Sequence, residues 1–70
     1  MEKEYRNVDF RDQDFTEQEW KGIRFEGCRF RGCRMESMVL QGCEFTNCDF
    51  GMAKMNDMDV KNTAFVNCRF

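Results

Sequence analysis

Large apolar residues recur at every fifth position of the chain, without exception, from residue 5 to residue 70. On an α-helix, five residues rotate the side chain by about 500°, so these positions would scatter around the helix axis. On a continuous strand, an odd spacing would place alternate members on opposite faces. The pattern therefore predicts short extended segments that each turn a corner after five residues, with the central residue pointing inward. These central residues are Tyr5, Phe10, Phe15, Trp20, Phe25, Phe30, Met35, Leu40, Phe45, Phe50, Met55, Val60, Phe65 and Phe70.

Residues that favour turns lie two positions after each central residue. Eleven of these thirteen positions hold Gly, Asn, Asp or Ser, which tolerate or promote turn geometry, and the exceptions are Glu17 and Met52. Two positions before each centre, strand alternation should turn the side chain inward again, and most of those residues are Cys or another apolar type. The polar exceptions Lys3, Gln13 and Gln18 fall within residues 1–20. These twenty residues are therefore expected to form a polar N-terminal capping coil.

A second period of twenty residues is superimposed on the period of five. Residues 23–30 align with residues 43–50 and 63–70, so four segments per coil would stack residues that are twenty apart. Two of the four inner columns would then be aromatic, one beginning at Tyr5 and the other at Phe10. The outward residues alternate in sign along such columns, and facing opposite charges are worth roughly 0.2–1 kcal/mol per pair. One such ladder is Asp9, Arg29, Asp49 and Arg69.

Residues 28–32, 33–37 and 43–47 read CRFRG, CRMES and CEFTN, and they resemble the pentapeptide-repeat family. That family's pattern is a small residue, a polar residue, Leu or Phe, and then two polar or small residues. The resemblance covers essentially the whole chain. It implies an all-β fold, a right-handed quadrilateral β-helix of about three and a half coils, as a single domain over residues 1–70. The chain departs from the pattern where Cys replaces the usual Ala and where charged residues precede the centre.

The charge balance and the cysteine content indicate where in the cell the protein is located. Charged residues make up 34% of the chain, but the net charge is only −2, which argues against general nucleic-acid binding. No apolar run is long enough to cross a membrane, and the N-terminus has no signal-peptide pattern. The five cysteines are an odd number without paired zinc spacing, which suits reduced thiols. The sequence therefore predicts a cytoplasmic location, no membrane association and no direct nucleic-acid binding.

Catalytic chemistry is not evident in the sequence. The chain has no histidine, and no nucleophile, base and orienting group can be assembled from its residues. We expect neither an enzyme nor a bound cofactor or metal. The cysteines are interpreted as small apolar residues that fill space beside the aromatic side chains. Together with the fourteen central residues, they complete the predicted structural core: Cys28, Cys33, Cys43, Cys48 and Cys68.

The C-terminal end is predicted to be uncapped, because the chain stops at the central residue Phe70. The end of a solenoid exposes unpaired backbone groups and apolar surface, which invites association. Three explanations stay open: a fragment of a longer solenoid, an end-to-end homodimer through this coil, or docking of another protein. The first two are favoured.

Two functions follow from these observations and from the resemblance. The favoured one is a non-enzymatic module that serves as a rigid protein–protein interaction scaffold for an unidentified partner. The alternative comes from the family alone, since some pentapeptide-repeat proteins imitate duplex DNA. They bind a type II topoisomerase, DNA gyrase, and confer resistance to quinolones or other gyrase poisons. That mechanism needs a face of carboxylates, whereas the second coil contains Arg24, Arg29, Arg31 and Arg34.

Overall fold

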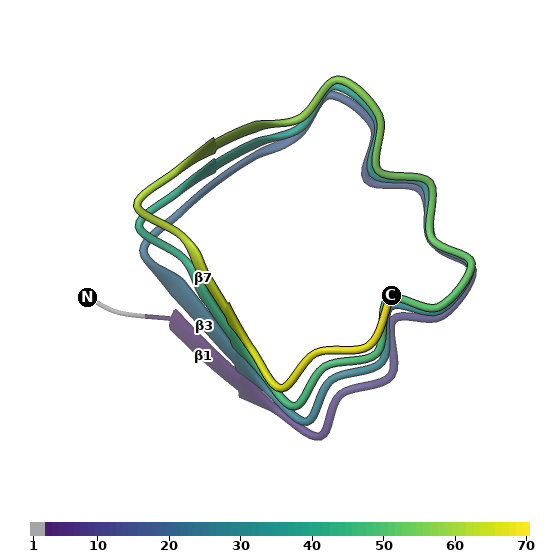
Figure 1. The fold of residues 1–70 in the computed structure, drawn as a ribbon, viewed down its shortest axis with the longest axis vertical. Coiled ribbons are helices and arrows are strands. Elements are labelled where there is room, and N and C mark those ends of the chain that lie inside the picture. The colour runs from purple at the N-terminus through teal and green to yellow at the C-terminus, as the bar shows by residue number, and fades with distance from the viewer. Residues whose placement is uncertain (1–2) are drawn as a thin grey trace.

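The computed structural model describes residues 3–70, which wind into a right-handed β-solenoid of about three turns (Figure 1). The described residues contain strands and no helix, so the all-β fold expected from the sequence is confirmed. The coil axis is the shortest dimension of the molecule, with an extent of 18 Å. The strands are β1 (Lys3–Arg6), β2 (Glu19–Lys21), β3 (Ile23–Glu26), β4 (Val39–Gln41), β5 (Glu44–Thr46), β6 (Asp59–Lys61) and β7 (Ala64–Val66).

The strands form two parallel sheets on two walls of the solenoid. One sheet has the order β1-β3-β5-β7 and the other the order β2-β4-β6. The register is twenty residues throughout, so Phe25 pairs with Phe45 in the first sheet and Leu40 pairs with Val60 in the second. The other two walls stack through single-residue parallel bridges, such as that between Asp9 and Arg29. The predicted four-sided coil with a period of twenty is therefore confirmed.

Left-handed backbone geometry makes the corners. All thirteen positions predicted to turn have positive φ angles, between 50° at Asn62 and 72° at Gly32. This conformation costs most L-residues roughly 1–2 kcal/mol, but Gly, Asn and Asp adopt it readily. The five-residue period therefore arises from one left-handed residue per segment, which ends the extended run and redirects the chain along the next wall.

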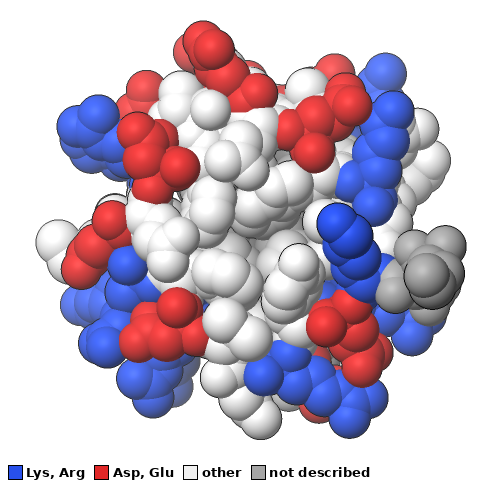
Figure 2. Space-filling view, turned by 180° about the vertical axis from the view of Figure 1, so that it is seen from behind, with Lys and Arg blue, Asp and Glu red and all other residues white. Residues whose placement is uncertain are grey.

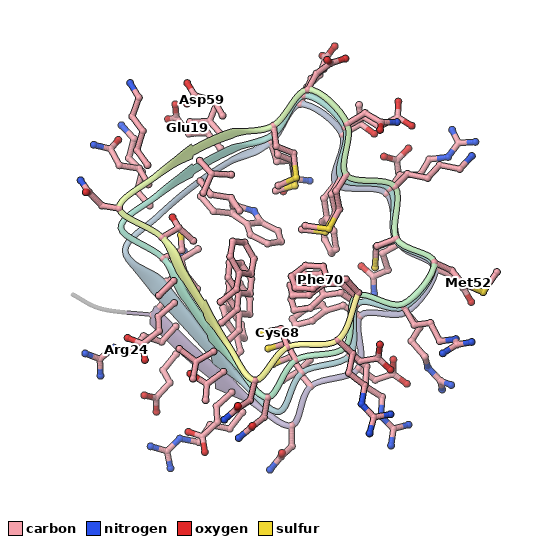
Figure 3. All side chains as sticks on the ribbon, in the orientation of Figure 1. Glu19, Arg24, Met52, Asp59, Cys68 and Phe70 are labelled. Carbon is pink, nitrogen blue, oxygen red and sulfur yellow. The ribbon has the colours of Figure 1, made fainter. Side chains whose placement is uncertain are left out.

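Met52 is poorly suited to its corner and provides a test of this account. Its φ is 59°, and its side chain is 78% exposed and points away from the solenoid (Figure 3). We expect Met52→Asn to raise the free energy of unfolding by up to about 1 kcal/mol, because Asn tolerates this conformation. A gain of that size should raise the melting temperature by about 4–8 °C. Thermal denaturation measures it, and the reverse change Asn47→Met, at φ 53°, should lower the melting temperature.

The charge ladder has the predicted register but mostly different contacts. The closest ion pairs lie within one coil, between residues two apart on the same face: Arg6 with Glu4 and Arg11 with Asp9, both at 2.8 Å. The hydrogen bond from Arg11 holds the pKa of Asp9 below its ordinary value. Between coils, within residues 3–70, only Arg6–Glu26 at 3.8 Å and Arg24–Glu44 at 4.0 Å are within ion-pair distance. In the Asp9 column opposite charges face each other in the predicted register but form no ion pair with one another, because Asp9 is bonded to Arg11 two residues along the chain.

Candidate functional site

Stacked phenylalanine rings fill two neighbouring quarters of the shaft (Figure 3). The rings of Phe25 and Phe45 are 4.7 Å apart and inclined by 3°, and those of Phe30 and Phe50 are 5.0 Å apart and inclined by 7°. The two columns meet edge to face, with Phe30 and Phe45 at 5.8 Å and 75°. Both arrangements are favourable for aromatic quadrupoles. The shaft is thus filled by its own side chains.

The structure places most of the predicted core residues inside the shaft, in two groups. The buried ones are Phe15, Phe25, Phe30, Met35, Leu40, Phe45, Phe50, Cys28, Cys33, Cys43 and Cys48. The partly buried ones are Tyr5, Phe10, Trp20, Met55, Phe65 and Cys68. The prediction is wrong for two residues of the last coils, Val60 and Phe70, which are 42% and 72% exposed. The reason is that no further coil covers them within residues 3–70.

Further residues contribute to the core, at the positions that strand alternation predicted to face inward. Met38 is fully buried, and Val8, Ile23, Ala53 and Met58 pack against the buried cluster. Each lies two positions before a central residue, where strand alternation turns the side chain inward. This spacing is the sequence signal that identifies them as core residues.

The cysteines form a regular set of thiols, of which four are buried and Cys68 is partly buried. Each Sγ lies within hydrogen-bond distance of the carbonyl oxygen of a central residue one coil below, as Cys33 does to Phe10 at 2.7 Å and Cys48 to Phe25 at 3.5 Å. All five are free thiols. Burial raises the pKa of Cys33 and raises that of Cys48 from 9.0 to about 12. A raised pKa suppresses the thiolate, which is the nucleophilic and metal-binding form. Residues 3–70 also contain no cluster of side chains suited to hold a metal.

A polar groove follows one outer corner of the solenoid, where the wall of β1, β3, β5 and β7 meets the next wall. It consists of two adjoining hollows of ≈ 370 and ≈ 280 Å³ that share Gly27 and Arg29. We call it the corner groove. The residues stacked at this corner are Asn7, Gly27, Asn47 and Asn67, and Gly27 is the one among them that has no side chain. No motif or spacing in the sequence indicates this groove. The residues that line its larger part are Gly27, Arg29, Asn47, Asp49, Asn67 and Arg69, with Cys28 and Cys48 at its floor.

Charged residues surround the molecule rather than enter it. Seen from the end opposite to that of Figure 1, uncharged atoms occupy the centre, and acidic and basic side chains alternate around the rim (Figure 2). No charged or polar residue is buried within residues 3–70. Polar and charged side chains can therefore contact a ligand only on the outer walls, at the corners and at the two ends of the solenoid.

Comparison with known proteins identifies the family. The model of the SV2A/B/C luminal domain matches residues 2–70, which is nearly the whole chain. The chain belongs to the SV2 luminal-domain family. No curated protein matches the sequence.

Membership of the SV2 luminal-domain family corrects several predictions. The assignment to the pentapeptide-repeat family is wrong, although the solenoid that it implied is present. The rigid scaffold of that family is wrong as a function, and the gyrase alternative loses its only basis. The cytoplasmic location and the absence of membrane association are also wrong, because a luminal domain belongs to a membrane-bounded compartment. The end-to-end homodimer stays a prediction. None of these residues forms a helix able to span a membrane.

Proposed function

We propose that this chain is a non-catalytic luminal domain, which a membrane-associated protein exposes to a vesicle lumen or to the extracellular medium. The observation that carries the proposal is the match of residues 2–70 to the SV2 luminal-domain family. The structure adds support, since the interior is apolar and the thiols with altered pKa values, Cys33 and Cys48, are shifted away from reactivity. The polar outer walls are the part of the domain that meets the lumen.

The chain allows a sensitive test of its location, because N-glycosylation occurs at N-x-S/T sites and the wild-type sequence contains none. The single change Ala64→Thr creates such a site at Asn62, and Asp9→Thr creates a second at Asn7. Both acceptor asparagines are exposed at corners. In the full-length protein expressed in eukaryotic cells, we expect each variant to gain a glycan that peptide N-glycosidase removes.

The matched control is Ala64→Val, which alters the same exposed position of β7 without creating a site. It should show no change in electrophoretic mobility. Absence of a glycan on both the Ala64→Thr and the Asp9→Thr variants would overturn the luminal assignment. The two acceptor sites, Asn7 and Asn62, lie at different corners, so poor modification of one site does not decide the test.

A further inference from the structure

The corner groove contains two arginines, Arg29 and Arg69, whose neighbours in the bridged column are the carboxylates Asp9 and Asp49. Arg29 and Arg69 make no ion pair or side-chain hydrogen bond within residues 3–70. The carboxylates of the same column are engaged elsewhere. Asp9 accepts hydrogen bonds from Arg11, and Asp49 accepts one at 2.8 Å from the backbone N–H two residues later. The groove therefore presents free guanidinium groups beside carboxylates that are already bonded.

The floor and the second wall of the corner groove add further donors. Cys28 and Cys48 are 1% exposed, and among residues 3–70 their backbone N–H groups donate no hydrogen bond. A buried N–H without a partner is unfavourable, and a bound acceptor would satisfy it. The side-chain amides of Asn47 and Asn67 also make no hydrogen bond within the part of the chain that the structure describes. Unsatisfied donors thus line the groove on three sides.

The spacing of these groups restricts the ligand. Arg29 and Arg69 are two coils apart in the same bridged column, which corresponds to about 10 Å at the usual strand separation. Asp49 lies between them, so a continuous row of anions would be repelled there, whereas a hydroxyl group could donate to its carboxylate. A fitting ligand alternates oxyanions with hydroxyl donors. The lining is mainly polar and lacks the apolar pockets that hold peptide side chains.

We propose that the corner groove binds an acidic carbohydrate chain lying along the solenoid axis. Its sulfate or carboxylate groups accept hydrogen bonds from Arg29 and Arg69, which are strong because both partners are charged. Its hydroxyl groups bond to Asp49 and to the amides of Asn47 and Asn67. Gly27 lines both hollows and has no side chain of its own, and the Oδ1 atom of Asn7 lies over it. This proposal goes beyond the luminal assignment and rests on different residues.

The test uses the purified chain and a heparin-derived tetrasaccharide, with binding measured by calorimetry. The double variant Arg29→Gln/Arg69→Gln removes both free guanidinium groups. The matched control Arg24→Gln/Lys54→Gln removes the same charge from other walls, since Arg24 points outward from β3 (Figure 3). Loss of one charge-assisted hydrogen bond costs about 1.5–3 kcal/mol, so we expect at least a tenfold loss of affinity in the groove variant. The control should lose clearly less.

A second variant blocks the corner groove without a change of charge. A Cβ at Gly27 would lie 2.5 Å from Oδ1 of Asn7, so the exposed Asn7 side chain must move aside, which it can do without a shift of the backbone. Asparagine also suits the φ of 63° at this corner. Gly27→Asn should therefore keep the fold, checked by circular dichroism, and weaken tetrasaccharide binding. If the Gly27→Asn variant does not fold, the comparison of the Arg29→Gln/Arg69→Gln variant with its control still tests the proposal.

Several results would overturn the proposal. One is the absence of tetrasaccharide binding, and another is an equal loss in the groove variant and its control, which would indicate general charge attraction. A third is inorganic sulfate that binds as tightly as the tetrasaccharide, which would indicate a simple anion site. A neutral tetrasaccharide should not bind. These outcomes are independent of the glycosylation test, because the binding assay does not depend on where the protein resides.

Discussion

Phe45→Ala is expected to lower the free energy of unfolding by about 3–5 kcal/mol, the usual cost of removing a buried phenylalanine. Phe45 is fully buried, and its ring stacks on Phe25 at 4.7 Å and on Phe65 at 5.0 Å. It also meets the edges of the rings in the neighbouring column. A single domain of 70 residues rarely has more than about 5 kcal/mol of stability, so the variant should be largely unfolded at 37 °C. Urea denaturation followed by circular dichroism measures the effect.

Phe70→Ala is the matched control, because it removes the same side chain from a position that is 72% exposed. Its ring stacks on Phe50 at 5.4 Å on one face only and meets Phe65 edge to face at 5.8 Å, so we expect a loss below about 1 kcal/mol. Equal destabilisation by the two changes would show that the stack is not the stabilising core. Phe45→Leu should fall between them, since it keeps most of the apolar volume.

Alkaline pH is expected to destabilise the fold through its buried thiols. Burial raises the pKa of Cys48 from 9.0 to about 12, and it raises that of Cys33 as well. A thiol whose pKa is higher in the folded state stabilises the fold fully below pH 9. That contribution is lost as the pH rises from 9 towards 12. We expect the free energy of unfolding to fall in this window by on the order of a few kcal/mol, which denaturation at a series of pH values measures.

Other groups titrate above pH 9, so the decisive comparison is with Cys48→Ala. This variant should be somewhat less stable at pH 7, because it leaves a small cavity, but its stability should decline less between pH 9 and 12. Ala53 occupies the equivalent inner position above Cys33, which shows that alanine fits such a column. Parallel declines in the wild type and the variant would contradict the role assigned to Cys48.

The fold was predictable from the sequence because one local rule repeats. A left-handed residue every five positions sets the corners, and the apolar residue between corners sets which side faces inward. Both signals are local, so residues such as Asn47 and Phe45 reveal their roles without knowledge of distant contacts. The period of twenty then fixes the register, since only that spacing aligns phenylalanine with phenylalanine.

The candidate site and the location were less accessible to the same reasoning. The corner groove depends on which polar groups are already bonded, and the sequence gives no sign that Asp49 accepts a hydrogen bond from the backbone of Gly51 while the Arg29 side chain makes none within residues 3–70. The cytoplasmic assignment failed because free cysteines were taken to indicate a reducing compartment. Burial provides another explanation, since Cys28 and Cys48 are almost fully covered and cannot pair without disruption of the core.

The strict register also determines how such a solenoid can change in length. Deletion of five residues, such as 26–30, would advance all later segments by a quarter of a turn and seat Phe45 over Trp20 instead of Phe25. Every ring stack and outer column that spans the deletion would lose its native partner, whereas Phe45 and Phe65, or Phe50 and Phe70, would stay twenty residues apart. Deletion or duplication of twenty residues would keep all of them in phase. This architecture should therefore grow and shrink only by whole turns.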